Sequence, residues 1–189
     1  MSTVRITELI SVEDYLEREI ESPAKHEYVA GAVFAMVGAK NSHNRIAGNA
    51  YGLLYTVLKD KPCQPCNSDT KIRVRNTDHV RFYYPDVSVV CDENSPSDSF
   101  QDRPVFIIEV LSESTRRLDD GEKRDAYFTI PTLSHYLLLE QDAAVAVMYE
   151  RNGGRFERHE FTSLDDVIPI TSLSISLALR DLYRSVVSG

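Results

Sequence analysis

Two carboxylates in this sequence stand where they could carry out chemistry. Asp86 follows Tyr84 and Pro85 at the head of an apolar run, and Glu109 lies inside the apolar run Val105–Leu111. A short, continuous, β-branched-rich run predicts a buried strand, where an unpaired charged glutamate is costly. A divalent cation shared by Asp86 and Glu109 would offset that cost. Mg²⁺ binds carboxylate oxygens, and a bound Mg²⁺ can polarise a phosphoryl oxygen and acidify a water molecule.

The bulk properties of the chain are those of an ordinary globular protein. Its 189 residues suit one domain with its own core, and 42% hydrophobic with 26% charged residues exclude disordered and fibrous classes. No apolar stretch approaches the ~18–20 residues that cross a bilayer, and residues 1–21 lack the apolar segment of a signal peptide. We therefore expect a cytoplasmic protein with no membrane partner. The net charge of −8 disfavours broad electrostatic binding of duplex DNA but leaves room for a nuclease.

The cysteines predict neither a disulfide framework nor a complete metal site. Their number, three, is odd, which argues against a disulfide framework. Cys63 and Cys66 have the spacing of half a zinc site, but no second pair of ligands follows, and structural zinc needs four. A turn bounded by prolines is the simpler interpretation of this segment.

Hydrophobic periodicity predicts one mixed α/β domain over residues 1–189. Ser11 is expected to cap a first helix with Asp14 as its reciprocal partner, and Pro23 follows the helix end. A hairpin with Gly31 at its turn comes next. The later predicted elements are a helix over 42–60 capped by Asn41-Ser42, strands over 70–75, 83–91 and 105–111, a helix over 119–129, strands over 134–140, 145–150 and 156–161, and a last helix over 177–187, with an unstructured loop over 92–103.

The order of these elements brings the two carboxylates together. If strands 83–91 and 105–111 pair as a hairpin, Asp86 and Glu109 can converge on one cation. In strand 70–75, Lys71, Arg73 and Arg75 alternate with apolar residues, so a basic face is expected there. That face could follow a phosphate backbone, although a solvated strand face explains it more simply.

Several motifs together resemble the Uma-type family of putative restriction endonucleases, a branch of the PD-(D/E)XK phosphodiesterase superfamily. The resemblance covers most of the chain. It is carried by Tyr84-Pro85-Asp86, by Ile108 to Thr115, by Asp120-Gly121-Glu122-Lys123 with Tyr127, by Ile130-Pro131-x-Leu133-x2-Tyr136, by Glu27-Tyr28-Val29-x-Gly31, by Ser42-His43 and by Ser68-Asp69-x-Lys71.

The resemblance implies a fold and a set of site residues. The implied fold is restriction-endonuclease-like: an α/β (α+β) domain with a central mixed β-sheet flanked by helices, an N-terminal helix and hairpin, and a C-terminal β-meander and helix. Asp86 and Glu109 become implied ligands of Mg²⁺ or Mn²⁺, and the backbone carbonyl of Val110 a further ligand. The lysine that the superfamily carries two residues after the acid is replaced here by Leu111.

The resemblance also implies where the missing lysine has moved. In the Uma-type branch the resemblance points to Lys123 on the following helix, as the implied catalytic base or charge stabiliser. Lys123 stands four residues before Tyr127, on the same helix face. Glu27 and His43 are additional candidates for the site.

Three hypotheses follow for the function. The first is a metal-dependent endonuclease that hydrolyses phosphodiester bonds of DNA, expected to act as a homodimer. The second is a catalytically inactive protein that keeps the fold as a binding or dimerisation module, favoured by the acidic balance and by Leu111. The third is a small zinc module around Cys63 and Cys66.

Overall fold

A six-stranded sheet forms the centre of the molecule. The computed structural model describes residues 9–77, 79–113 and 115–186. Neighbouring strands of this sheet are antiparallel except β8 and β9, which run parallel. In spatial order the strands are β11 (Arg155–Phe161), β10 (Ala146–Asn152), β9 (His135–Glu140), β8 (Pro104–Leu111), β6 (Val87–Val90) and β3 (Gln64–Asn67).

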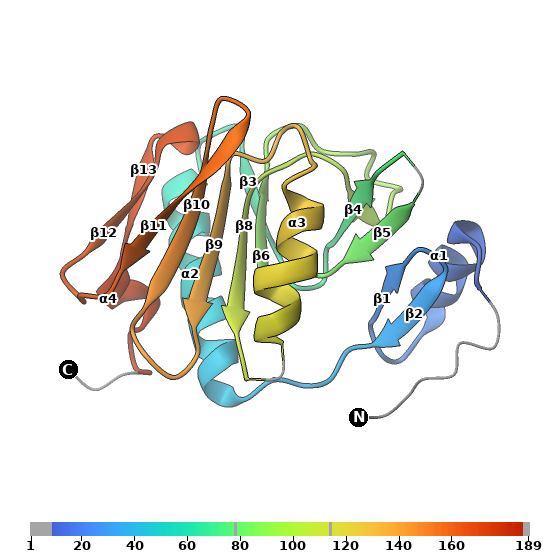
Figure 1. Ribbon diagram of the computed structural model, residues 1–189, viewed down its shortest axis with the longest axis horizontal. Coiled ribbons are helices and arrows are strands. Elements are labelled where there is room, and N and C mark those ends of the chain that lie inside the picture. Colours follow the sequence, from blue (N-terminus) through green and yellow to red (C-terminus); the bar gives the residue numbers. More distant parts are fainter. Residues whose placement is uncertain (1–8, 78, 114, 187–189) are drawn as a thin grey trace.

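Helical segments cover both faces of this sheet (Figure 1). One face carries α2 (Asn41–Leu58), and the other carries η1 (Leu118–Lys123), a π-helical turn, followed by α3 (Arg124–Tyr127). Side chains alternate along β8, because successive residues of a strand point to opposite faces. Phe106, Ile108 and Val110 join the core beneath α2, whereas Ile107 and Leu111 join the core beneath α3.

A second sheet of five strands packs around the N-terminal helix. Its spatial order is β2 (Ala32–Ala35), β1 (His26–Val29), β5 (Val80–Tyr83), β4 (Lys71–Arg75) and β7 (Phe100–Gln101). Helix α1 (Val12–Glu21) buries Tyr15 against Tyr28 and Phe82, with ring centroids 5.0 and 5.4 Å away. The predicted hairpin is confirmed: Ala30 and Gly31 have positive φ, which the tight β1–β2 turn requires.

The C-terminal part forms a small strand pair and a single helical turn. β12 (Val167–Ile170) pairs with β13 (Ile175–Ala178) around the 3₁₀ turn η2 (Thr171–Leu173), and α4 (Leu179–Leu182) follows. The helix predicted over 177–187 is therefore wrong at Leu177 and Ala178, which belong to β13. It is also longer than α4, which ends at Leu182, and Val187 lies outside the described residues. A strand forms here instead of a helix because the pairing of β12 with β13 buries the side chains of Ile168, Ile170 and Leu177.

Two further predictions about strands are wrong. The segment predicted as one strand over 83–91 holds the last residue of β5, Tyr83, and the whole of β6, and these two strands belong to different sheets. Tyr84-Pro85-Asp86 separates them, since proline has no N–H to donate to a strand ladder. The loop predicted over 92–103 contains β7, which pairs in parallel with β4.

Of the two predicted helix caps, the one at Ser11 is confirmed and the one at Asn41-Ser42 is wrong. Oγ of Ser11 accepts a hydrogen bond of 3.0 Å from the N–H of Asp14, as expected for the cap of α1. Helix α2 instead begins at Asn41, after Lys40 as N-cap, and none of the described side chains caps it, so Asn41 and Ser42 lie inside the helix. Among the described residues, no helix is long and apolar enough to cross a membrane.

The cysteines form a disulfide bond that the sequence argued against. Cys63 and Cys91 are bridged, and Cys66 is free. The antiparallel pairing of β3 with β6 sets Gln64 opposite Val90, so the residues just outside each strand also meet. With Cys63 in a disulfide, Cys63 and Cys66 do not form half of a zinc site.

The prediction of an exposed basic face on β4 is also wrong for Lys71, its first residue. Lys71 is buried, with its Nζ 5.5 Å from the ring of Tyr84 and 5.8 Å from that of Tyr15. Arg73 forms an ion pair with Asp102, with 2.6 Å between Nη2 and Oδ2. These two basic residues therefore have partners within the protein.

Candidate active site

Asp86 and Glu109 meet where β6 begins beside β8. The antiparallel register pairs Val87 with Ile108. Asp86, which precedes Val87, therefore lies opposite Glu109, which follows Ile108. The N–H of Asp86 donates to Oε2 of Glu109 over 3.2 Å, and the N–H of Val110 donates to Oδ2 of Asp86 over 2.7 Å. The two carboxylates that the sequence expected to converge are therefore neighbours. The implied role of Val110 as a carbonyl ligand stays a prediction, since Val110 contacts Asp86 through its N–H.

Glu109 points to the face of the sheet that η1 and α3 cover. Its neighbours along the strand on this side, Ile107 and Leu111, pack beneath α3, and the Glu109 side chain is 4% exposed. The hydroxyl of Tyr127 on α3 donates to Oε1 of Glu109 over 3.4 Å. Burial raises the pKa of Tyr127 well above its ordinary value, so the phenol remains a neutral donor.

Lys123 lies at the centre of a group of carboxylates. Its Nζ is 2.7 Å from Oε1 of Glu27, 3.3 Å from Oδ1 of Asp119 and 3.9 Å from Oε1 of Glu109. The lysine ends the π-helical turn η1, and such turns occur frequently at functional sites. The structure thus brings the lysine of the following helix to the acid of β8, although Leu111 occupies the superfamily's usual lysine position.

Asp119 belongs to this site and was missed by the sequence analysis. Its side chain is 5% exposed, although its acidic surroundings in the sequence suggest a solvated helix face. The hydroxyl of Tyr136 donates to the carbonyl oxygen of Asp119 over 2.8 Å, which fixes this turn on the sheet. The spacing of four residues between Asp119 and Lys123 was the available indication, because residues i and i+4 share a helix face.

Glu27 reaches the site from the second sheet. It lies in β1, and its Oε1 accepts a hydrogen bond of 3.4 Å from the N–H of Tyr84 as well as the ion pair from Lys123. Tyr84 begins the segment that leads to Asp86, so Glu27 ties that segment to η1. The additional candidate Glu27 is thus part of the cluster.

His43 contacts the other carboxylate. From the first turn of α2, its Nε2 lies 3.3 Å from Oδ2 of Asp86. The side chains of His43 and Asp86 are 12% and 16% exposed. The other ring nitrogen, Nδ1, is buried and has no hydrogen-bond partner among the described residues. Of the two additional candidates, Glu27 therefore contacts Lys123 and His43 contacts Asp86.

The site contains more carboxyl groups than basic side chains. Burial raises the pKa of Glu109 well above its ordinary value, and attraction by Lys123 only partly opposes this. Burial also raises the pKa of Asp86. Burial by itself would lower the pKa of Lys123, but the surrounding carboxylates outweigh it and raise that pKa. A buried cluster with several carboxylates and one ammonium group is stabilised by any further cation that enters it.

The donor atoms fit a hard divalent cation. Among the described residues no hydrogen-bond donor reaches Oδ1 of Asp86, and no three His, Cys, Asp or Glu side chains already converge as a metal site. Mg²⁺ is commonly held by only one or two carboxylates, with water or phosphate oxygens in the other positions. Asp86 and Glu109 supply this number of carboxylates, so the pair suits such an ion.

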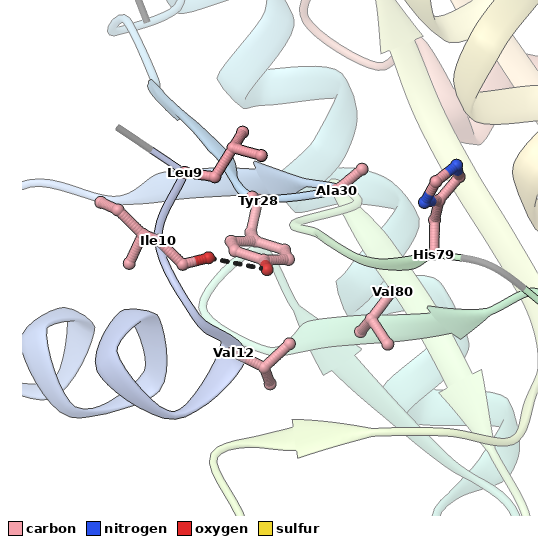
Figure 2. Close-up of a pocket in the computed structure, with 8 residues that line it drawn as sticks. Leu9, Ile10, Val12, Tyr28, Ala30, His79 and Val80 are labelled. Carbon is pink, nitrogen blue, oxygen red and sulfur yellow. Dashed lines mark hydrogen bonds between the residues drawn. The ribbon is translucent and has the colours of Figure 1, made fainter. Parts of the chain in front are cut away.

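A surface pocket lies away from these residues. It has a volume of about 260 Å³ and lies between the segment that leads into α1 and the adjoining ends of β1 and β5, where Tyr28 donates a hydrogen bond of 3.0 Å to the carbonyl of Ile10 (Figure 2). Its lining holds none of the acidic residues described above. The chemistry-bearing residues are therefore grouped at the start of β6 rather than in this pocket.

Comparisons with known proteins identify the family and the fold of the chain. The model of the Uma2 family, described as putative restriction endonuclease, matches residues 12–180. Two uncharacterized proteins of Synechocystis sp. are similar: one is 33% identical over 94% of this chain and 93% of its own length, the other 32% identical over 82% and 88%. A crystal structure of a putative nuclease belonging to DUF820 from Anabaena variabilis has the same fold, with a TM-score of 0.73 and 18% identity over 92% of this chain and 97% of that chain.

Proposed function

Because the chain belongs to the Uma2 family of putative restriction endonucleases, we propose that it is a metal-dependent endonuclease that hydrolyses phosphodiester bonds of DNA. The observation that carries the proposal is the cluster in which Asp86 and Glu109 adjoin each other and Lys123 lies 3.9 Å from Glu109. Two carboxylates and a lysine at one point form the residue set that such hydrolysis needs.

Each residue of the cluster receives a role in this proposal. Asp86 and Glu109 hold Mg²⁺ or Mn²⁺, with the carbonyl of Val110 as a further ligand. The bound cation would polarise the phosphodiester and acidify the attacking water. Lys123 stabilises negative charge that develops on the phosphorus oxygens, since its contacts with carboxylates favour the charged ammonium form.

The surrounding residues prepare Lys123 and Glu109 for these roles. Glu27 and Asp119, which lie in two different elements, hold the ammonium group of Lys123 in place. These two contacts restrict the conformations of the lysine side chain. Tyr127 donates to Oε1 of Glu109 and limits the orientations of that carboxylate. A duplex cut on both strands would need two such sites, which is why a homodimer is part of the proposal.

The experiment is a cleavage assay with purified protein and plasmid DNA, with Mg²⁺ or Mn²⁺ and with EDTA. We expect cleavage only with the cation, and a loss on the order of 100-fold or more in Asp86→Asn and in Glu109→Gln. Asp92→Asn and Glu160→Gln alter exposed carboxylates outside the cluster and serve as matched controls. Cleavage that persists in both site variants would exclude this assignment of the site.

A binding or dimerisation module without catalysis is the second candidate. It is favoured by Leu111 at the superfamily's usual lysine position and by the net charge of −8. Calorimetric titration with Mn²⁺ separates the two: binding that is lost in Asp86→Asn supports the nuclease, whereas absence of binding supports the module.

A further inference from the structure

His43 and Asp86 lie in direct contact at the edge of the carboxylate cluster. The distance between Nε2 of His43 and Oδ2 of Asp86 is 3.3 Å. Two adjacent ligands of an octahedral ion with bonds of about 2.1–2.2 Å are themselves about 3 Å apart. A small adjustment of the two side chains would therefore place both atoms on one cation.

The His43–Asp86 pair is more exposed to solvent than Glu109 is. Both oxygens of Glu109 accept hydrogen bonds, Oε1 from Tyr127 and Oε2 from the N–H of Asp86. Asp86 accepts one at Oδ2, from the N–H of Val110, and no described residue donates to its Oδ1. The side chains of His43 and Asp86 retain 12% and 16% exposure, whereas that of Glu109 retains 4%. A cation that enters the cluster thus meets a nitrogen donor next to the carboxylate of Asp86.

We propose that Nε2 of His43 is a metal ligand beside Asp86 and that it makes the site prefer a transition-metal ion over Mg²⁺. This inference rests on the metal site of the proposed function and specifies which ion it takes. Imidazole is a favourable ligand for first-row transition ions, whereas Mg²⁺ takes oxygen ligands and dehydrates reluctantly. Affinity for the transition ions rises from Mn²⁺ to Co²⁺, so Co²⁺ is the sharper probe.

The test is calorimetric titration of the full chain with Co²⁺ and with Mg²⁺, together with the visible absorption spectrum of the Co²⁺ form. We expect one Co²⁺ per chain, bound more tightly than Mg²⁺. In His43→Ala the Co²⁺ affinity should fall roughly tenfold or more and the spectrum should change, while the Mg²⁺ affinity changes by less than about threefold. His159→Ala, at an exposed position of β11, is the matched control.

A second variant keeps the test decisive if His43→Ala does not fold. His43→Asn replaces the imidazole by an amide that can offer an oxygen, and should reduce the preference for Co²⁺ over Mg²⁺. Unchanged Co²⁺ affinity and spectrum in the folded His43 variant would overturn the inference, and the metal site itself would stand if Asp86→Asn still abolished binding. If neither ion binds the wild-type chain, both this inference and the metal site of the proposed function fail.

Discussion

Lys123 and Glu27 form an ion pair of 2.7 Å between Nζ and Oε1, although they come from different layers of the fold. Lys123 lies on the turn that covers the central sheet, and Glu27 lies in β1 of the second sheet. The pair is buried, with side-chain exposures of 7% and 9%. It therefore joins the N-terminal hairpin to the turn that carries the proposed catalytic lysine.

Removal of this lysine should destabilise the protein strongly. Lys123→Met leaves Glu27 and Asp119 buried without their cation, and breaking a buried pair in this way costs about 3–5 kcal/mol. Urea unfolding monitored by circular dichroism measures the change. Arg158→Met, which breaks an exposed pair with Glu160, should cost no more than about 1 kcal/mol. Equal losses in the two variants would contradict the burial of the Lys123 pair.

Asp119 should matter for cleavage and not for cation binding. It contacts Lys123 at 3.3 Å, and its part in the proposed mechanism is to hold that ammonium group. Asp119→Asn is expected to reduce kcat about 10–100-fold while the affinity for Mn²⁺ stays within a few-fold of wild type. Asp119→Glu, which keeps the charge, should recover part of the rate. Failure of both variants to bind Mn²⁺ would instead place Asp119 among the ligands.

A divalent cation should stabilise the folded chain. Binding to the native state alone contributes about 2.7 kcal/mol when the cation is present at 100 times its Kd. Thermal unfolding of wild type should therefore move to higher temperature on addition of Mn²⁺ and return on addition of EDTA. Asp86→Asn should abolish the shift and Asp92→Asn should retain it. An equal shift in both variants would indicate that the ion binds elsewhere.

His135 should make the fold sensitive to mild acid. Burial lowers its pKa, although Glu150, 3.4 Å away, opposes the shift. Below a pH of about 6.5 the unfolded chain binds this proton more readily than the folded one, so stability falls as the pH decreases. The contribution is at most about 1.4 kcal/mol per pH unit. His135→Gln should reduce the slope of unfolding free energy against pH between 6.5 and 5; an unchanged slope would contradict the assignment.

The disulfide can be verified by counting thiols. Under denaturing, non-reducing conditions the chain should react with about one equivalent of a thiol reagent, at Cys66, and after reduction with three. Cys63→Ser should lower the unfolding free energy by about 2–4 kcal/mol under oxidising conditions. Three reactive thiols before reduction would show that Cys63 and Cys91 are not bridged.

The sequence by itself determined the two carboxylates and their strands. An apolar run around Glu109 predicts a buried strand, and the run after Asp86 predicts its neighbour, because these patterns are local and period-based. The same local reasoning identified the N-terminal helix and the hairpin at Gly31. It failed at Tyr84-Pro85-Asp86, since whether two apolar runs share a strand depends on the sheet that each one joins.

The tertiary structure alone decided that Asp119 lies beside Lys123 and that Lys71 is buried. Asp119 reads as a solvated residue in an acidic segment, and Lys71 as part of an exposed basic face, yet both are buried. Cys63 and Cys91 become neighbours only when β3 pairs with β6. Burial and contact between distant residues depend on packing, which no local pattern encodes. The family resemblance pointed to Lys123, but only the packing of its helical turn on the sheet shows that its Nζ lies 3.9 Å from Oε1 of Glu109.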